Sequence, residues 1–546
     1  MKNIFRIIAI ALIGTFSCES FLEEENVPVA TAQYLGTAAG YRDALTGAYS
    51  TLRTFYAGGE DGPSLTVFGT DEYTEGSDGG RKYLNRYDAS LNPSAVDLLT
   101  VWQNIYRGIN STNIVIGRAD EITGLDQSEI DGYVAEARFL RANYYFILVQ
   151  LFGAVTISEE ETAGAIVEAQ RSSVTDVYNL IVSDLDLAVN NLPDIQSDYG
   201  RATKFAALHL RAKVHLTRAT MDAGATANTE YTAALNDAET VITSGQFALL
   251  DDFASVFDQS GEVHNEVIWS IQYSQDELFG GGNSLHLYYL MQYDNQPGML
   301  RDTENGRPFK RFAPTSYAAN VFDKSIDSRY DKSFKTVFYC NRPGTYQITN
   351  ELQDISVTLE EGDTAIWLPG YELDAAELAT KQFQVLSPSR YTNRLYPTLT
   401  KFLDPNRPSV QHGAGSRDFI YMRLADTYLI SAEANMMLGN MDEAVDRVNA
   451  VRRRAAFDGM EDAMEITTTD LDIDFILDER TRELLGEFHR WFDLVRTGKL
   501  LERVGLHNPD GSSNIQDYHV LRPIPQAQID LTRNANGESY GQNTGY

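Results

Sequence analysis

Apolar residues recur at helical spacing over two long stretches of this sequence, and this periodicity constrains the fold more than any other feature. The clearest stripe advances in alternating steps of three and one residues and so occupies one helix face: Tyr41, Ala44, Leu45, Ala48, Tyr49 and Leu52. Comparable stripes run through 102–116, 134–151, 203–221 and 231–243. The last two read as an antiparallel pair. The pattern predicts a mainly α-helical chain.

Helical periodicity returns beyond residue 417. The segment 421–455 reads as two helices separated at Gly439, because glycine readily adopts the left-handed conformation that ends many helices. Asn440 followed by Glu443 is typical of a capping box at the start of the second helix. The unit resembles a tetratricopeptide helix pair. Such pairs bury little surface alone, so we expect several to stack.

The middle of the chain has a different character. Residues 246–416 hold nine of the sixteen prolines, and short runs at 267–271 and 363–367 read as strands. The sequence therefore predicts a tetratricopeptide-like scaffold of helix pairs with an irregular overlay rich in loops and short strands. In this interpretation the helical parts span 37–245 and 417–546, and the chain forms one compact unit.

The N-terminus reads as a targeting segment. A positively charged start precedes an apolar run at 7–16, which is shorter than the roughly 20 residues that span a membrane but suits a secretory signal. The following Cys18 resembles the lipidated cysteine of bacterial lipoproteins. We therefore predict a signal peptide at 1–17 and a lipidated, acidic tether at 18–36. A cleaved signal with an incidental cysteine is the alternative.

The acidic balance and the cysteine count exclude several classes of protein. Lys and Arg number 45 against 77 Asp and Glu, a formal net charge of −32. A surface this acidic repels phosphate backbones, so we expect no nucleic-acid partner. The two cysteines, Cys18 and Cys340, are too few for a disulfide framework or a cysteine-based zinc site. We expect Cys340 to be a buried thiol.

Catalytic and metal-binding motifs are absent from the sequence. It contains no HExxH and no GxSxG, and no two histidines are spaced i, i+4. Asp470, Asp472 and Asp474 begin like a calcium loop, but Phe475 stands where that loop requires glycine. We therefore expect these aspartates at a helix N-terminus. We predict no enzyme activity, no metal and no cofactor.

A stripe of glutamates is the other feature that suggests catalysis. Glycosidases need two carboxylates that face each other across a sugar, about 5–10 Å apart. Here the acidic residues share one helix stripe and are interleaved with arginines, so ion pairs are the better interpretation. The stripe comprises Glu479, Glu483 and Glu487, with Arg480, Arg482 and Arg490.

Ten segments have a distinctive order and spacing: CESFLEEE (18–25), LTGAYSTLR (45–53), WQNIYRGINSTN (102–113), AEARFLRANYYFILVQLFG (135–153), VYNLIVSDLDLAVNNLP (177–193), GRATKFAALHLRAKVHL (200–216), RLADTYLISAEA (423–434), ERTRELLGEFHRWFDLVRTGKL (479–500), RPIPQAQI (522–529) and QNTGY (542–546). Together they resemble the SusD/RagB-type family of outer-membrane nutrient-binding lipoproteins. The resemblance covers essentially the whole chain. One departure is Phe488, where the family more often has glycine.

The resemblance implies a function. Such proteins are lipid-anchored in the outer membrane, face the cell exterior, bind nutrient oligosaccharides and deliver them to a TonB-dependent transporter of the SusC type. The same architecture with peptides as cargo is one alternative, and a helical-repeat adaptor that binds only proteins is another. The resemblance also implies that 246–416 is the ligand-side region.

Residue types suited to sugars gather in two loops. Aromatic rings stack on the C–H faces of sugars, and polar side chains bind their hydroxyl groups. Segments 55–88 and 279–298 combine glycine, tyrosine and polar residues, and such loops are costly to order unless they touch something. The alternative is that these rings pin the loops to the scaffold. The predicted ligand-binding residues are Asp71, Tyr73, Arg81, Tyr83, Trp102, Asn283, Tyr288 and Tyr293.

The four tryptophans divide into two groups. Trp102, Trp269 and Trp491 fall on apolar stripes, so we expect them in the core. Trp102 is the exception that could reach a ligand, because it lies nearest the first loop. Trp367 ends a strand-like run and could face solvent.

Overall fold

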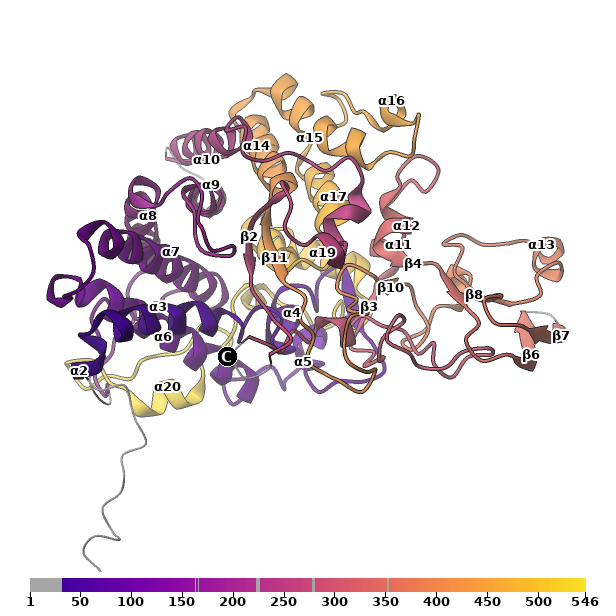
Figure 1. The fold of residues 1–546 in the computed structure, drawn as a ribbon, viewed down its shortest axis with the longest axis horizontal. Coiled ribbons are helices and arrows are strands. Elements are labelled where there is room, and N and C mark those ends of the chain that lie inside the picture. Colours follow the sequence, from indigo (N-terminus) through magenta and orange to yellow (C-terminus); the bar gives the residue numbers. More distant parts are fainter. Residues whose placement is uncertain (1–31, 163, 165, 222–225, 277–279, 351–352) are drawn as a thin grey trace, which may run out of the picture.

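The computed structural model describes residues 32–162, 164, 166–221, 226–276, 280–350 and 353–546. Helices make up most of the molecule on the left and top of Figure 1, and short strands lie on the right. The predicted signal peptide, Cys18 and most of the predicted tether lie outside the described residues. The mainly helical fold with an irregular overlay is confirmed.

The N-terminal helices follow the predicted stripes closely. α7 begins with a capping box between Asp126 and Glu129 and ends at Gly153, whose φ is 71°. Successive helices from α6 to α10 pack as neighbours, so 203–221 and 231–243 form the predicted pair. The bounds are α2 (Ala32–Leu35), α3 (Ala38–Leu52), α4 (Asp61–Thr66), α5 (Tyr83–Arg86), α6 (Val96–Gly117), α7 (Gln127–Phe152), α8 (Val174–Asn191), α9 (Lys204–Met221) and α10 (Ala227–Ile242).

The C-terminal helices join the same scaffold, because α14 packs against α10 as well as α15. Gly439 has φ 86° and ends α14, as predicted. The predicted capping box is wrong: the Asn440 amide donates to Asn435 instead of capping α15. The bounds are α14 (Leu424–Leu438), α15 (Met441–Ala455), α16 (Glu461–Met464), α17 (Ile473–Leu484), α18 (Arg490–Arg496), α19 (Leu500–His507) and α20 (Gln526–Leu531).

Short strands tie the middle of the chain to both helical parts. β1 (Tyr73–Glu75) pairs with β3 (Phe312–Pro314), and β2 (Val267–Ile271) pairs with β11 (Phe419–Arg423). The start of the predicted 421–455 helix unit is therefore strand. The remaining strands are β4 (Phe334–Lys335), β5 (Val337–Tyr339), β6 (Gly344–Asn350), β7 (Gln353–Leu359), β8 (Thr364–Trp367), β9 (Gln384–Val385) and β10 (Thr398–Leu399), with short helices α11 (Ser316–Asn320), α12 (Arg329–Ser333) and α13 (Ala375–Ala379) between them.

The core contains the residues that the apolar stripes predicted. Trp102, Trp269 and Trp491 are at most 3% exposed, which confirms their placement. Cys340 is a buried free thiol in a second, smaller cluster under β5 and β8. Trp367 is partly exposed at the end of β8. Asp472 caps α17 through the backbone N–H of Phe475, as expected of a helix N-terminus.

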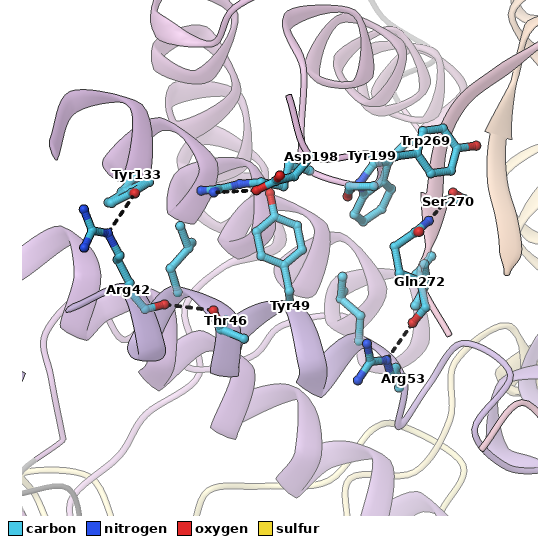
Figure 2. A pocket seen from close by; sticks show the side chains of 15 residues that line it. Arg42, Thr46, Tyr49, Arg53, Tyr133, Asp198, Tyr199, Trp269, Ser270 and Gln272 are labelled. Atoms are coloured by element: carbon cyan, nitrogen blue, oxygen red, sulfur yellow. Dashed lines mark hydrogen bonds and ion pairs between the residues drawn. The ribbon is translucent and has the colours of Figure 1, made fainter. Parts of the chain in front are cut away.

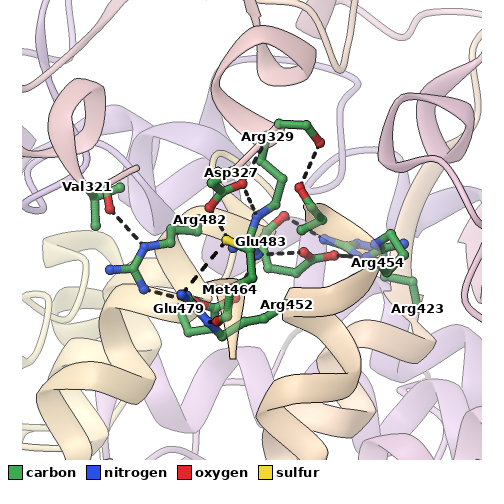
Figure 3. A network of polar contacts seen from close by, with 12 residues as sticks. Val321, Asp327, Arg329, Arg423, Arg452, Arg454, Met464, Glu479, Arg482 and Glu483 are labelled. Carbon is green, nitrogen blue, oxygen red and sulfur yellow. Dashed lines mark hydrogen bonds and ion pairs between the residues drawn. The ribbon is translucent and has the colours of Figure 1, made fainter. Parts of the chain in front are cut away.

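The glutamate stripe forms buried ion pairs, as predicted, but with other partners (Figure 3). Glu479 contacts Arg329 at 2.7 Å, and Glu483 contacts Arg423 at 2.6 Å. Of the three predicted arginines only Arg482 binds the stripe, at 2.9 Å from Glu479. The others turn to different elements: Arg480 pairs with Asp426 and Asp493, and Arg490 pairs with Asp71. Burial raises the pKa of Glu483, but three arginines outweigh it and lower the pKa to about 2.

Phe488 occupies a position where the backbone favours glycine. Its φ is 69°, in the left-handed region that costs roughly 1–2 kcal/mol for an ordinary residue. The ring is buried, and its centroid lies 4.6 Å from that of Phe419. The buried ring therefore offsets backbone strain at this turn.

Candidate functional site

The structure brings the two tyrosine- and glycine-rich segments together. The β1–β3 ladder runs along one edge of the contact, and the backbone N–H of Gly76 donates to the Arg311 carbonyl at 2.9 Å. The N–H of Ser284 donates to the Ala57 carbonyl at 2.8 Å. Segment 55–88 therefore lies directly against 284–312, although the residues bonded here are more than 200 positions apart in the sequence.

Arg81 is the centre of a polar surface where these segments meet. Its guanidinium donates to Glu60 at 2.5 Å and to Asp61 at 2.6 Å, and it lies 3.0 Å from Asp97. The hydroxyl of Tyr83 donates to Asp97 at 2.5 Å. We call this group the Arg81 surface and include in it Arg311, which is ion-paired to Glu60, and Phe309, whose ring centroid lies 5.3 Å from the Arg311 guanidinium carbon.

Local backbone geometry holds the Arg81 surface in place. The single turn α5 ends at Tyr87, whose φ is 53°, and its hydroxyl donates to the Gly69 carbonyl at 2.6 Å. On the other side, Gly62 at the start of α4 lies so close to the Phe55 carbonyl that an added Cβ would sit 2.0 Å from the oxygen. The turns that carry Glu60 and Tyr83 are therefore held by contacts between residues of segment 55–88 itself.

The charged side chains of the Arg81 surface are ion-paired and half-buried. The Arg81 side chain is 24% exposed and its carboxylate partners are 12–29% exposed. Burial raises the pKa of Asp61 even though Arg81 opposes it. Burial and the hydrogen bond to Asp97 raise the pKa of Tyr83, so it stays protonated and can donate.

The Arg81 surface is shallow rather than deep. The cleft that Glu60, Arg81 and Arg311 help to line has a volume of only about 10 Å³. Beside it, the centroid of the partly exposed Phe309 ring lies 5.2 Å from the guanidinium carbon of Arg307 and 5.3 Å from that of Arg311. An arrangement of rings and fixed polar groups without a cavity suits an extended ligand that lies across the surface.

Six of the eight predicted ligand-binding residues are interior in this structure. Each is at most 6% exposed: Asp71, Tyr73, Trp102, Asn283, Tyr288 and Tyr293. These side chains are packed almost entirely against protein, although Trp102 also borders a pocket of about 400 Å³. Their contact with a ligand stays a prediction. Arg81 and Tyr83 remain candidates because both keep exposed area.

The buried six have structural partners. Asp71 accepts from Arg490 at 2.5 Å and from Arg503 at 2.6 Å, so it holds two helices against the loop. Tyr293 donates to the Gly306 carbonyl at 2.5 Å, and the Asn283 amide donates to the Arg417 carbonyl at 2.5 Å. These are the loop-pinning contacts that were the alternative to ligand binding.

The remaining three are packed by rings. Tyr73 lies edge-on to Tyr289, with centroids 5.1 Å apart, and Tyr288 lies against Phe312 at 6.1 Å. Trp102 meets Phe152 edge-on at 5.0 Å. Loop composition does not report which face of a segment turns inward, so the sequence had no signal that separated these rings from Tyr83.

Several residues of the Arg81 surface were not predicted. Glu60 and Asp61 lie in the first segment, and their position between glycines is a weak signal at best. Asp97, Phe309 and Arg311 lie outside both segments. Only the strand pairing and the long-range ion pairs bring them to the site.

A separate pocket of about 330 Å³ lies between α3, α7, the turn at 198–201 and β2 (Figure 2). Its polar groups bind one another: Tyr49 and Arg201 both donate to Glu136, at 2.6 Å. Arg53 donates to the Gln272 carbonyl at 2.7 Å. A wider cleft of about 960 Å³ between α9, α10, α14 and α18 has a mainly apolar lining.

The described part of the chain holds neither a metal site nor a membrane-spanning helix. No group of three or more His, Cys, Asp or Glu side chains is placed there to hold a metal ion. None of the helices described is long and apolar enough to cross a bilayer.

Comparisons with known proteins identify the family. A model of the SusD family matches residues 265–546, and a model described as starch-binding associating with outer membrane matches residues 69–216. The chain belongs to the SusD family. It is therefore a member of an outer-membrane-associated family, and the predicted resemblance is confirmed.

Relatives match over nearly the whole chain. The SusD-like protein P25 of Formosa agariphila is 26% identical over 98% of both chains. The starch-binding protein SusD of Bacteroides thetaiotaomicron is 25% identical over 84% of this chain and 80% of its own. A laminarin-binding SusD-like protein has the same fold, with a TM-score of 0.68 and 23% identity over 93% of this chain and 100% of its own. The last two descriptions name binding and none of the three names a reaction, in agreement with the prediction that the chain is not an enzyme.

Proposed function

We propose that this protein binds nutrient oligosaccharides at the Arg81 surface and delivers them to a SusC-type transporter. The observation that carries the proposal is the match, over most of the chain, to relatives described as binding starch or laminarin. The Arg81 surface supplies matching chemistry. Its ion-paired side chains are held in fixed orientations, and the Tyr83 and Phe309 rings keep exposed area.

The geometry favours weak, reversible capture. A stacked ring contributes about 0.5–1.5 kcal/mol beyond its buried area. A few rings and hydrogen bonds on a shallow surface give dissociation constants on the order of μM to mM. Such affinity suits a protein that must release its ligand to another.

Calorimetry with a panel of purified oligosaccharides tests ligand binding. Arg81→Gln removes the charge at the centre of the surface, and we expect affinity to fall about tenfold, the loss of one charged hydrogen bond. Arg42→Gln is the matched control, because Arg42 is an exposed arginine of the separate pocket in Figure 2. Equal affinity in wild type and Arg81→Gln, or a larger loss in the control, contradicts the site.

Anchoring and delivery are the second part of the proposal. Cys18 would carry the lipid, so Cys18→Ser should move the protein from the outer-membrane fraction to the soluble fraction. Affinity purification of the native protein from membranes should recover a TonB-dependent transporter. A wild-type protein that is soluble, or a variant that stays attached, contradicts anchoring through Cys18.

Peptides are the second candidate cargo. The net charge of −32 favours cationic ligands over anionic ones. Calorimetry with mixed basic peptides, set beside the oligosaccharide panel, separates the two. A protein that binds peptides and no oligosaccharide supports this alternative, and one that binds neither supports a purely protein-binding adaptor.

A further inference from the structure

Arg522 is a fully buried arginine without a carboxylate partner. It lies between the short helix at Asp517–Val520 and α20, and it has 0% exposure. Its Nε, Nη1 and Nη2 atoms have no hydrogen-bond acceptor among the described residues. An arginine side chain carries a positive charge and five N–H donors and has no acceptor. Burial of an uncompensated charge is strongly unfavourable, so a compensating group is expected.

The other arginines buried to this degree show what compensation looks like in this protein. Arg141 pairs with Asp184 at 2.8 Å, and Arg329 pairs with Asp327 at 2.8 Å. Arg423 and Arg480 likewise each contact carboxylates at 2.7 Å or less. Within the described residues no carboxylate stands in this relation to Arg522. Among these buried arginines, the lack of a described carboxylate partner is therefore specific to Arg522.

Hydrogen-bond donors outnumber acceptors around Arg522. Its guanidinium carbon lies 4.4 Å from the Trp491 ring centroid and 5.8 Å from that of Tyr87. The Trp491 Nε1–H is also buried and has no acceptor in the described structure. The Tyr87 hydroxyl donates its own proton to Gly69. Burial raises the pKa of Tyr87, and the charge of Arg522 and the N–H groups of Trp491 and Arg522 oppose that rise, so the Tyr87 oxygen is the acceptor that both donors face. Neither donor makes a hydrogen bond of normal geometry to it, and one hydroxyl oxygen cannot satisfy the three guanidinium nitrogens and the indole N–H together.

Nearby carboxylates are already engaged. Asp71 is bound by both Arg490, at 2.5 Å, and Arg503, at 2.6 Å. A water molecule could accept the hydrogen bonds of Arg522 but would leave its charge uncompensated. A monovalent anion provides both the charge and the acceptor capacity.

We propose that Arg522 and Trp491 bind a small monovalent anion of the size of chloride beside the Tyr87 hydroxyl. The anion joins three parts of the chain: the end of α5, the start of α18 and the segment before α20. Because α5 carries Tyr83, the anion stabilises the base of the Arg81 surface. This inference does not depend on the identity of the cargo.

Bromide replaces chloride in such sites and scatters anomalously. Crystals of the full chain grown in low bromide should show an anomalous peak in contact with the Arg522 guanidinium and Trp491 Nε1. In solution, the unfolding midpoint should rise by at least about 2 °C as chloride replaces gluconate at constant ionic strength, and the rise should saturate below about 100 mM.

Arg522→Met should abolish that chloride dependence, whereas Arg86→Met, at an exposed arginine of α5, should retain it. No bromide peak with a water in its place overturns the proposal, as does a midpoint that is the same in both salts. A peak without any chloride effect on the wild-type midpoint means binding at crystal concentration only and also overturns it. If Arg522→Met does not fold, the two wild-type measurements decide.

Discussion

A substitution at Asp71 distinguishes a structural role from a ligand-binding role most clearly. Asp71 lies in the segment predicted to bind sugar, yet it is 0% exposed and accepts hydrogen bonds from Arg490 and Arg503. Asp71→Asn keeps the volume of the side chain and removes its charge. Two buried guanidiniums would then lose a shared carboxylate. Glu72 compensates little at pH 7, because burial raises its pKa to about 8 and leaves it mostly protonated.

The magnitude follows from this geometry. Removal of one partner of a buried ion pair costs about 3–5 kcal/mol. Arg503 also contacts Asp474 at 3.2 Å and is ion-paired to Asp478, so part of its compensation remains. We therefore expect the free energy of unfolding to fall by about 3 kcal/mol. The affinity of the folded variant for oligosaccharide should stay within about twofold of wild type, because Asp71 has no surface that a ligand can reach.

Urea unfolding measures the first quantity and calorimetry below the unfolding transition measures the second. Asp78→Asn is the control: its carboxylate is 45% exposed and pairs with Lys310 at 3.0 Å, so the loss should be below about 1 kcal/mol. A stable Asp71→Asn variant that has lost its affinity would refute the reasoning and restore Asp71 as a ligand contact.

Three further predictions concern pH, backbone strain and acid stability. Burial raises the folded-state pKa of Glu72 to about 8, so its contribution to the free energy of unfolding is present at low pH and is lost as pH rises from about 4.5 to about 8. Glu72→Gln should remove that pH dependence in urea unfolding, and a variant with the pH profile of wild type would contradict the prediction. Phe488→Gly relieves the strain at φ 69° but deletes a buried ring, and ring deletion costs about 3–5 kcal/mol, so we expect the free energy of unfolding measured in urea to fall by about 1–4 kcal/mol; a stabilised variant would show that strain dominates. Although burial opposes them, arginines lower the pKa of Glu483 and of Asp493 to about 2 each, so the stability that these carboxylates contribute is present above about pH 4.5 and is lost as pH falls toward 2. The unfolding midpoint should drop across that window, and a flat midpoint there would contradict the buried pairing.

Local signals in the sequence predict the helices well and the site poorly. The stripe from Tyr41 to Leu52 lies within α3, and Gly439 ends α14, because periodicity and a left-handed turn are properties of neighbouring residues. The predicted capping box at Asn440 is wrong for a similarly local reason: the Asn440 amide donates to Asn435, near the end of α14, instead of capping α15.

The site depends on contacts that no local pattern encodes. Asp71 binds Arg490 across 419 positions, and Arg311 reaches Glu60 across 251. Loop composition correctly drew attention to segments 55–88 and 279–298, which do meet. It did not report that Tyr73 and Tyr293 turn inward while Tyr83 remains partly exposed, since that choice is made by non-local packing, of Tyr73 against Tyr289 and of Tyr293 against Phe338.

A crystal structure with a bound oligosaccharide tests the central proposal most directly. The account predicts that the sugar lies across the Arg81 surface, within hydrogen-bonding distance of Arg81 or Arg311 and in contact with the Tyr83 or Phe309 ring. The glycosidic bonds of the ligand should be intact. A sugar seated instead in the pocket of Figure 2 or in the cleft between α9 and α14, or a cleaved ligand, would contradict the account.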